Sequence, residues 1–182
     1  MVVYGANGLT ARSQARDLLA LAVREVWGLS PLPEIARHEG GKPFFPERED
    51  LHFNLSHSGG LALCALDGAP VGADIQIVKE WRPSLPRRVC SPDELAWLED
   101  QPEFWPAFTR LWALKEARAK ESGRGLTRPI RDIRVPLPEE GAVLFDGLWF
   151  RSWSGSGWAA AVCGHTEPPE KILKKVLDIP TV

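Results

Sequence analysis

The sequence predicts an α+β fold built from two similar halves. A helical pattern of apolar residues, followed by strand patterns, occurs twice along the chain, although no sequence repeat is visible. With 182 residues and a hydrophobic content of 44%, the chain can bury a sizeable core, either in one domain or in two small halves packed together. We expect the two halves to enclose a cleft between them.

The first half is expected to contain one helix and several strands. In order, we expect a strand at residues 2–4, a helix at 10–27, and strands at 61–66 and 70–77. The helix has apolar residues at spacings of three and four, and Gly28 should end it. Asp67 and Gly68 lie between the last two strands, so we predict that these strands form a β-hairpin.

The second half repeats this order. We expect a helix that opens at Ser91, a helix that carries Glu116 after a break at residues 102–106, strands at 130–135, 143–153 and 158–163, and a short amphipathic helix at 172–177. The first of these helices has a clear start, because Ser91 can cap it, Pro92 suits its first position and Glu94 completes a capping box. A loop rich in Pro and Arg precedes it. We therefore assign residues 1–78 to an N-terminal lobe and 79–182 to a C-terminal lobe.

The composition restricts the class of partner and the compartment. A net charge of −2 and a pI near 6.1 give no overall basic field, which argues against a general nucleic-acid binder. Cys64, Cys90 and Cys163 are far apart in apolar contexts and fit no disulfide or zinc pattern, so we expect buried free thiols in a reducing compartment. We find neither a signal-peptide pattern nor an apolar run of about 18 residues. These observations predict a cytoplasmic protein with no membrane partner.

Two segments carry candidate chemistry. Asp74 and Gln76 lie in a strand pattern and should point to the same face. Glu116 and Lys120 are one turn apart at the edge of the apolar stripe of a predicted helix. Two carboxylates and a lysine in this arrangement would suit a site for a metal ion and a phosphate. The alternative is that Asp74 is a solvated edge residue and that Glu116 and Lys120 form an ordinary surface ion pair.

Four sequence motifs occur in a specific order. They are GKP at 41–43, FNLSHS at 53–58, VGADIQ at 71–76 and LWALKEARAKESGRGL at 111–126. In this order they resemble the 4'-phosphopantetheinyl transferases, specifically the two-lobed type that modifies peptide, polyketide and fatty-acid carrier proteins. The segment WAAAVCG at 158–164 is similar to the family's final core strand. The resemblance implies a pseudo-twofold fold of two α/β lobes, with the active site in the cleft between them.

The resemblance implies a magnesium site. Asp74 and Glu116 stand where the family has its Mg²⁺ carboxylates, and Lys120 matches a lysine that contacts the pyrophosphate of coenzyme A. The family usually has Glu at the third metal-strand position, which is Gln76 here. Its neutral amide oxygen can still ligate Mg²⁺ or hold a bound water, but one negative charge is lost. We therefore expect weaker Mg²⁺ binding.

The resemblance also implies contacts to the nucleotide of coenzyme A. Ser56 and His57 match the pair that binds the region of the 3'-phosphate, and Lys42 matches a lysine near the adenine nucleotide. Arg12 and Ser13 resemble an Arg/Thr pair that reaches the same phosphate. Taken alone, His57 would be an ordinary loop residue, Lys42 a turn residue and Arg12 an exposed residue in the first turn of a helix. Their order along the chain is what favours a nucleotide site.

The implied activity is transfer of 4'-phosphopantetheine from coenzyme A to a serine of an acyl, peptidyl or polyketide carrier protein, with release of 3',5'-ADP. Glu116 is the candidate base for that serine, and Lys120 with Mg²⁺ would spread the developing charge.

Besides a structural or nucleic-acid role, which the Arg-rich stretches 82–88 and 124–134 suggest only weakly, two other functions remain open at this point. One is an inactive relative that only binds coenzyme A or a nucleotide, which the presence of Gln76 instead of the family's usual Glu suggests. The other is a metal-dependent phosphohydrolase, which would normally need more carboxylates or histidines than these segments provide. The turn before Arg12 is short, so the N-terminal lobe is shortened relative to longer relatives. Because the two-lobed type needs no partner chain to build its cleft, we expect a monomer.

Overall fold

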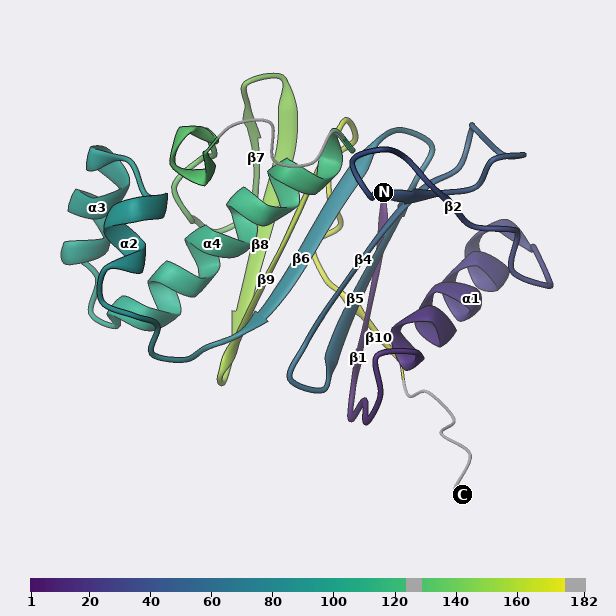
Figure 1. The fold of residues 1–182 in the computed structure, drawn as a ribbon, viewed down its shortest axis with the longest axis horizontal. Helices are drawn as coiled ribbons and strands as arrows, with labels where there is room; N and C mark the ends of the chain where they lie inside the picture. The colour runs from purple at the N-terminus through teal and green to yellow at the C-terminus, as the bar shows by residue number, and fades with distance from the viewer. Residues whose placement is uncertain (124–128, 176–182) are drawn as a thin grey trace.

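Two four-stranded sheets, each covered by a helix on one face, organise the molecule (Figure 1). The computed structural model describes residues 1–123 and 129–175. The first half contains β1 (Val2–Asn7), α1 (Gln14–Trp27), β2 (Ala36–Arg37), β3 (Pro43–Phe44), β4 (His52–Ser58) and β5 (Leu61–Asp67). The second half contains β6 (Val71–Ile77), α2 (Leu85–Val89), α3 (Pro92–Glu99), α4 (Phe104–Glu121), the 3-10 helix η1 (Ile130–Asp132), β7 (Ala142–Phe145), β8 (Leu148–Gly155), β9 (Trp158–Gly164) and β10 (Leu173–Lys175).

The two halves share a topology. In the first sheet the strand order is β10-β1-β5-β4, and in the second it is β6-β9-β8-β7. Each half thus consists of a strand, a helix and a hairpin, in the order β1, α1, β4, β5 in the first half and β6, α4, β8, β9 in the second. In each sheet, the second strand of the hairpin lies between the first strand of that half and the other hairpin strand. This arrangement confirms the predicted α+β class with two similar halves.

Sheet membership places the boundary between the halves at the turn that joins β5 to β6. Strand β6 pairs with β9 along its whole length, from Val71 opposite Gly164 to Ile77 opposite Trp158. Strand β10, in contrast, returns to the first sheet and pairs in parallel with β1. We had assigned residues 1–78 and 79–182 to the two lobes. From the sheets, we propose instead a boundary at residues 68–70. Strand β10 then belongs to the first half, although it follows the second half in the sequence.

The predicted hairpin of β5 with β6 is wrong. Strand β5 pairs with β4 across a two-residue turn, with Ser58 opposite Leu61. Gly59 and Gly60 form that turn with φ of 53° and 80°, a backbone region that glycine adopts at little cost. Asp67 and Gly68 instead lead the chain from one sheet into the other. A turn signal predicts a reversal of the chain, but it does not predict which strand the next segment pairs with.

Three other local predictions fail. Residues 143–153 do not form one strand, because β7 ends at Phe145 and forms a hairpin with β8, which begins at Leu148. Residues 130–135 do not form a strand, because Ile130–Asp132 is a 3-10 helix. In the tail, Leu173–Lys175 forms a strand rather than part of an amphipathic helix, and the rest of that predicted helix, at 176 and 177, lies outside the described residues. The tail contains too few residues for local helix propensity to outweigh pairing with the free edge of β1.

The sheets meet edge to edge, and side chains rather than a backbone ladder join them. The backbone N–H groups of alternate β6 residues donate to side chains of alternate β4 residues. The bonds run from Ala73 N to Asn54 Oδ1 at 3.0 Å, from Ile75 N to Ser56 Oγ at 3.2 Å and from Ile77 N to Ser58 Oγ at 3.2 Å. We call these three bonds the seam. The seam satisfies the backbone donors that the edge strand β6 would otherwise leave unpaired.

Helix α4 lies directly against β6. A Cβ atom on Gly72 would stand 1.9 Å from the backbone oxygen of Ala117, so only glycine permits this approach. The helix ends at Glu121, and Gly123 follows it with a φ of 69°. The close packing holds the end of α4 against the beginning of β6 (Figure 1).

The second half has a buried ion pair in its core. Lys115 Nζ lies 2.9 Å from Glu94 Oε1, with side-chain exposures of 1% and 8%. The same ammonium donates to the backbone oxygens of Ile133 at 2.9 Å and Ile130 at 3.3 Å. Glu94 also accepts from Ser91 N, which completes the capping box that the sequence predicted for α3. Lys115 therefore ties α3, α4 and η1 together.

Candidate active site

Asp74 is buried at the seam and is held by three donors. Its exposed fraction is 1%. Oδ1 accepts a hydrogen bond from Ser56 Oγ at 2.7 Å and from Lys120 Nζ at 2.6 Å. Oδ2 accepts from Gln76 Nε2 at 3.0 Å. Strand alternation places Asp74 and Gln76 on one face as predicted, but Asp74 is not a solvated edge residue.

Lys120 reaches Asp74 from the last turn of α4. Its ammonium also lies 3.4 Å from Ser56 Oγ and 3.4 Å from the backbone oxygen of Ala73. The side chain remains 31% exposed. The ion pair is therefore closed on the side of the seam and open on the other, where a ligand can approach the ammonium.

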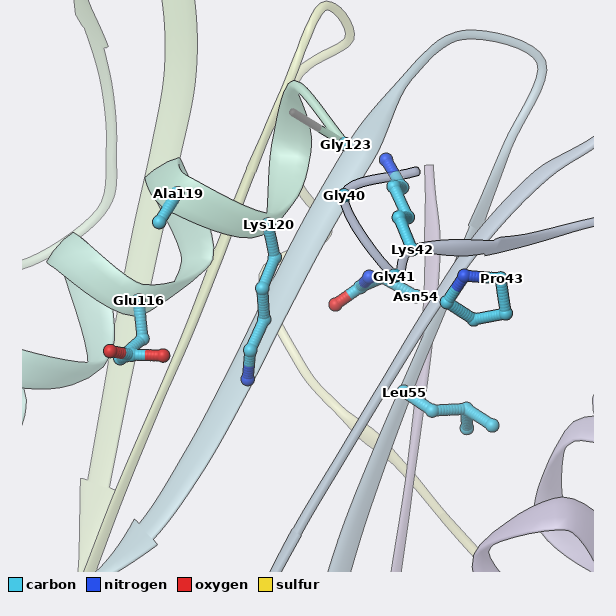
Figure 2. A pocket seen from close by; sticks show the side chains of 10 residues that line it. All are labelled: Gly40, Gly41, Lys42, Pro43, Asn54, Leu55, Glu116, Ala119, Lys120 and Gly123. Atoms are coloured by element: carbon cyan, nitrogen blue, oxygen red, sulfur yellow. The ribbon is translucent and has the colours of Figure 1, made fainter. Parts of the chain in front are cut away.

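Glu116 lies one turn before Lys120 and extends toward the same side of α4 (Figure 2). Among residues 1–123 and 129–175, no donor hydrogen-bonds to its carboxylate. Burial raises the pKa of Glu116; the nearby charge of Asp74 raises it further, while Lys120 lowers it. A half-buried carboxylate near a second carboxylate is suited to binding a cation or taking up a proton.

An open cavity of about 240 Å³ adjoins these groups (Figure 2). The loop before β3, strand β4 and helix α4 line it, through Gly40, Gly41, Lys42, Pro43, Asn54, Leu55, Glu116, Ala119, Lys120 and Gly123. Because the loop and β4 come from the first half and α4 from the second, the cavity lies between the halves, where the sequence placed the cleft.

Lys42 uses its ammonium inside the protein. Its Nζ donates to the backbone oxygens of Val71 at 2.9 Å and Glu121 at 2.7 Å, and burial lowers its pKa. The stem of Lys42 lines the cavity, but its ammonium points toward the end of α4 (Figure 2). Lys42 therefore fastens the loop of one half to the helix of the other. The nucleotide contact implied by the resemblance stays a prediction.

His57 and Arg12 form a pair beside a second, smaller hollow. Arg12 Nε donates to His57 Nε2 at 2.9 Å, and a hollow of about 150 Å³ lies between them and residues 9–11, 60 and 61. Burial lowers the pKa of His57, and the charges of Arg12 and Lys120 lower it further. The neutral ring can accept the bond from Arg12. The structure thus brings Arg12 and His57 together, and their contact with a phosphate stays a prediction.

Two predicted nucleotide contacts lie differently. Ser13 precedes α1 in helical conformation, and its side chain makes no capping hydrogen bond. Ser56 points to Asp74 rather than to the side of His57, because neighbouring strand residues face opposite ways. The phosphate role of both residues stays a prediction.

Asn54 is a site residue that the sequence reasoning missed. It is buried, lines the cavity and accepts the seam bond from Ala73 N. The available signal was the recurrence of polar residues at every second position, 54, 56 and 58, with Leu55 between the first two. Such alternation normally indicates a solvent-facing side of a strand, whereas here these side chains face a second strand.

A comparison with known families identifies the fold. Residues 70–163, more than half of the chain, match the 4'-phosphopantetheinyl transferase superfamily. The chain belongs to this family. The match covers the second half of the protein, which contributes Asp74, Glu116 and Lys120.

Named relatives agree with this assignment. A 4'-phosphopantetheinyl transferase of Bacillus subtilis is 36% identical over 131 residues, which cover 69% of this chain and 58% of the relative. The Sfp transferase of Bacillus subtilis strain 168 is 34% identical over 144 residues, 74% of this chain and 64% of the relative. AcpT of Salmonella typhi is 46% identical over 116 residues, 60% of this chain and 59% of the relative. The chain thus spans less than two thirds of the length of these relatives.

Proposed function

We propose that this protein transfers 4'-phosphopantetheine from coenzyme A to a serine hydroxyl of a carrier protein and releases 3',5'-ADP. The observation that carries the proposal is the placement of Glu116, free of donors among the described residues, beside the Lys120–Asp74 pair at an open cavity between the halves. Membership of the transferase family and the names of its relatives support it.

The residues of the chain have separate tasks in this reaction. The serine oxygen forms a bond to the β-phosphorus of coenzyme A, and the bond from that phosphorus to the bridging oxygen breaks, with its electrons leaving on 3',5'-ADP. Glu116 takes the serine proton on its carboxylate, for which a raised pKa is favourable. The exposed side of the Lys120 ammonium faces the negative charge that develops on the phosphate oxygens.

The donor set fits a magnesium ion. Asp74 and Glu116 offer hard carboxylate oxygens. Burial and the charge of Asp74 disfavour the ionised form of Glu116, and a bound cation would offset this effect. Asp74, Glu116 and, with its amide turned, Gln76 would hold the ion. When bound, Mg²⁺ neutralises charge on the phosphates and orients them. In the present structure Gln76 donates its Nε2 to Asp74, so its oxygen points away from that carboxylate.

The partner is proposed to be an acidic carrier protein. Arg87 and Arg88 are exposed on the short helix α2 and offer positive charge to such a partner. Replacing both by Glu should raise the KM for the carrier protein several-fold and leave the KM for coenzyme A unchanged. Equal effects on both KM values contradict this docking site. Arg16 and Arg24 of α1, also exposed, provide a control with the same charge reversal on the other half.

In residues 1–123 and 129–175, no helix has the length and hydropathy needed to span a membrane. The three cysteines are buried and free, as predicted. The monomeric state, the cytoplasmic location and the absence of a nucleic-acid partner stay predictions.

The proposed function is tested by intact-mass spectrometry of an apo carrier protein incubated with this protein, coenzyme A and Mg²⁺. A gain of one phosphopantetheine group, lost with Glu116→Ala, supports the transfer and the role of that carboxylate. The isosteric variant Glu116→Gln separates loss of the base from loss of packing. Release of 3',5'-ADP without a carrier protein would indicate a phosphohydrolase. Binding of coenzyme A without transfer to several carrier types would indicate an inactive binding relative.

A further inference from the structure

Ser56 differs from the other seam residues in what its side chain donates to. Ser56 and Ser58 each accept a backbone N–H of β6, from Ile75 and Ile77, and both bonds measure 3.2 Å. Only Ser56 also donates to a carboxylate, Asp74 Oδ1, at 2.7 Å. The two serines therefore have matched seam bonds, and Ser56 differs in its bond to Asp74 and in a longer contact of 3.4 Å from Lys120 Nζ.

The hydroxyl of Ser56 is fully committed. A serine hydroxyl can donate one hydrogen bond, and Ser56 donates it to Asp74. Its oxygen accepts a hydrogen bond from Ile75 N and lies 3.4 Å from Lys120 Nζ. Its exposed fraction is 7% and that of Asp74 is 1%, so this contact is largely shielded from solvent. A phosphate could accept a hydrogen bond from this hydroxyl only if the hydroxyl stopped donating to Asp74.

We propose that Ser56 is a positioning residue for Asp74. The inference rests on the proposed function and deepens it: Ser56 fixes the rotation of the carboxylate that would hold the divalent cation, and it does so from the first half of the molecule. Hydrogen-bond partners of ligating carboxylates orient them and contribute to metal affinity. Because Ile75 N holds Ser56 in turn, the seam sets the orientation of Asp74 together with the alignment of the two halves.

The test compares Ser56→Ala with Ser58→Ala in the full chain. Each variant loses one seam bond of the same length, but only the first also loses the bond to Asp74. Mn²⁺ binding is measured by electron paramagnetic resonance without coenzyme A, and coenzyme A binding is measured by calorimetry. The Kd for Mn²⁺ should rise about tenfold in Ser56→Ala and stay within about twofold of the wild type in Ser58→Ala. The Kd for coenzyme A should be unchanged in both.

Two results would overturn the inference. A weaker affinity of Ser56→Ala for coenzyme A with unchanged Mn²⁺ binding would make Ser56 a nucleotide contact. Equal Mn²⁺ affinities in the two variants would reduce its role to the seam. If Ser56→Ala does not fold, Ser56→Cys, which is nearly isosteric and a weaker donor, replaces it in the same comparison.

The outcome is separable from that of the proposed function. If the wild type modifies a carrier protein while both variants bind Mn²⁺ equally, the transfer stands and the positioning role fails. If Ser56→Ala alone weakens Mn²⁺ binding while no carrier protein is modified, the positioning role stands and the transfer fails. A wild type that binds no Mn²⁺ overturns the positioning role, because Asp74 then has no cation to be oriented for.

Discussion

Helix α4 carries two lysine–carboxylate pairs whose surroundings differ. Lys115 pairs with Glu94 at 2.9 Å, and Lys120 pairs with Asp74 at 2.6 Å. The Lys115 ammonium is closed in by Glu94 and two backbone oxygens, with an exposed fraction of 1%. The Lys120 side chain is 31% exposed and lines the cavity beside Glu116.

The comparison shows how a structural pair differs from one that is available for function. The distance between the charges does not distinguish them, and both lysines belong to the same sequence motif. What distinguishes them is whether the ammonium has an open side. The Lys115 ammonium already donates to three groups within the fold, whereas the Lys120 ammonium can still contact a ligand. The contacts around each lysine therefore separate a role in stability from a role in chemistry along one helix.

The largest expected effect is on stability, at the closed pair. Lys115→Met should lower the free energy of unfolding by about 3–5 kcal/mol, because it leaves Glu94 as an uncompensated buried charge. Urea denaturation measures the change. Adding Glu94→Leu should restore part of the loss, since removing both charges avoids the unpaired one. A loss below about 1 kcal/mol in the single variant would show that the pair is not isolated from water.

At the open pair the effect should fall on catalysis instead. Lys120→Met should lower kcat/KM by about 100-fold, because a charge that faces the phosphate oxygens is lost. Stability should fall by less than in Lys115→Met, because the Lys120 side chain is 31% exposed and Asp74, although buried, keeps the hydrogen bonds from Ser56 and Gln76. Steady-state kinetics with a carrier protein, together with urea denaturation, measure both quantities. A variant that loses stability as strongly as Lys115→Met would remove the distinction between the pairs.

Glu116 sharpens the comparison through pH. Burial and Asp74 raise its pKa in the folded protein above that in the unfolded chain, so stability falls as the pH rises through the folded-state pKa. Without divalent ions, Glu116→Gln should therefore be more stable than the wild type at neutral pH. This advantage should vanish below the unfolded-state pKa, where Glu116 is protonated in both states. Urea denaturation in EDTA across this pH range measures it.

Glu25 provides a control of opposite sign for the pH experiment. Hydrogen bonds from Lys175 and Tyr4 lower its pKa, so its contribution to stability is present above the unfolded-state pKa and is lost as the pH falls through the folded-state pKa. Glu25→Gln should thus be less stable than the wild type at neutral pH, with a gap that closes in acid. The same pH dependence for both variants would contradict burial as the cause at Glu116.

The smallest expected effect is at Gln76. Gln76→Glu should lower the Mg²⁺ concentration for half-maximal rate by a few-fold, because it adds a negative charge next to Asp74. The measurement is the initial rate as a function of Mg²⁺ at saturating coenzyme A. An unchanged or higher requirement would show that position 76 lies outside the coordination sphere and serves only to hold Asp74.

Much of the local structure could be predicted from the sequence. The spacing of apolar residues predicted α1 and the body of α4, and Ser91 with Glu94 predicted the start of α3. The order of the motifs identified the family and the group formed by Asp74, Glu116 and Lys120. These signals are short-range: helix periodicity and caps involve residues within a turn or two of each other, so local sequence determines them.

Tertiary structure alone decided which distant groups meet. Strand β6 leaves β5 for β9, Lys42 donates to the backbone of Glu121, 79 positions away, and Ser56 turns to Asp74 across the seam. A strand pattern reveals which side chains share a face, but not which strand lies beside it. Likewise, the open side of Lys120 and the closed side of Lys115 depend on packing between elements. The sequence by itself determined the helices and the chemical groups of the site, and the packing of the two halves determined their partners, because hydrogen-bond geometry between distant segments exists only in the folded chain.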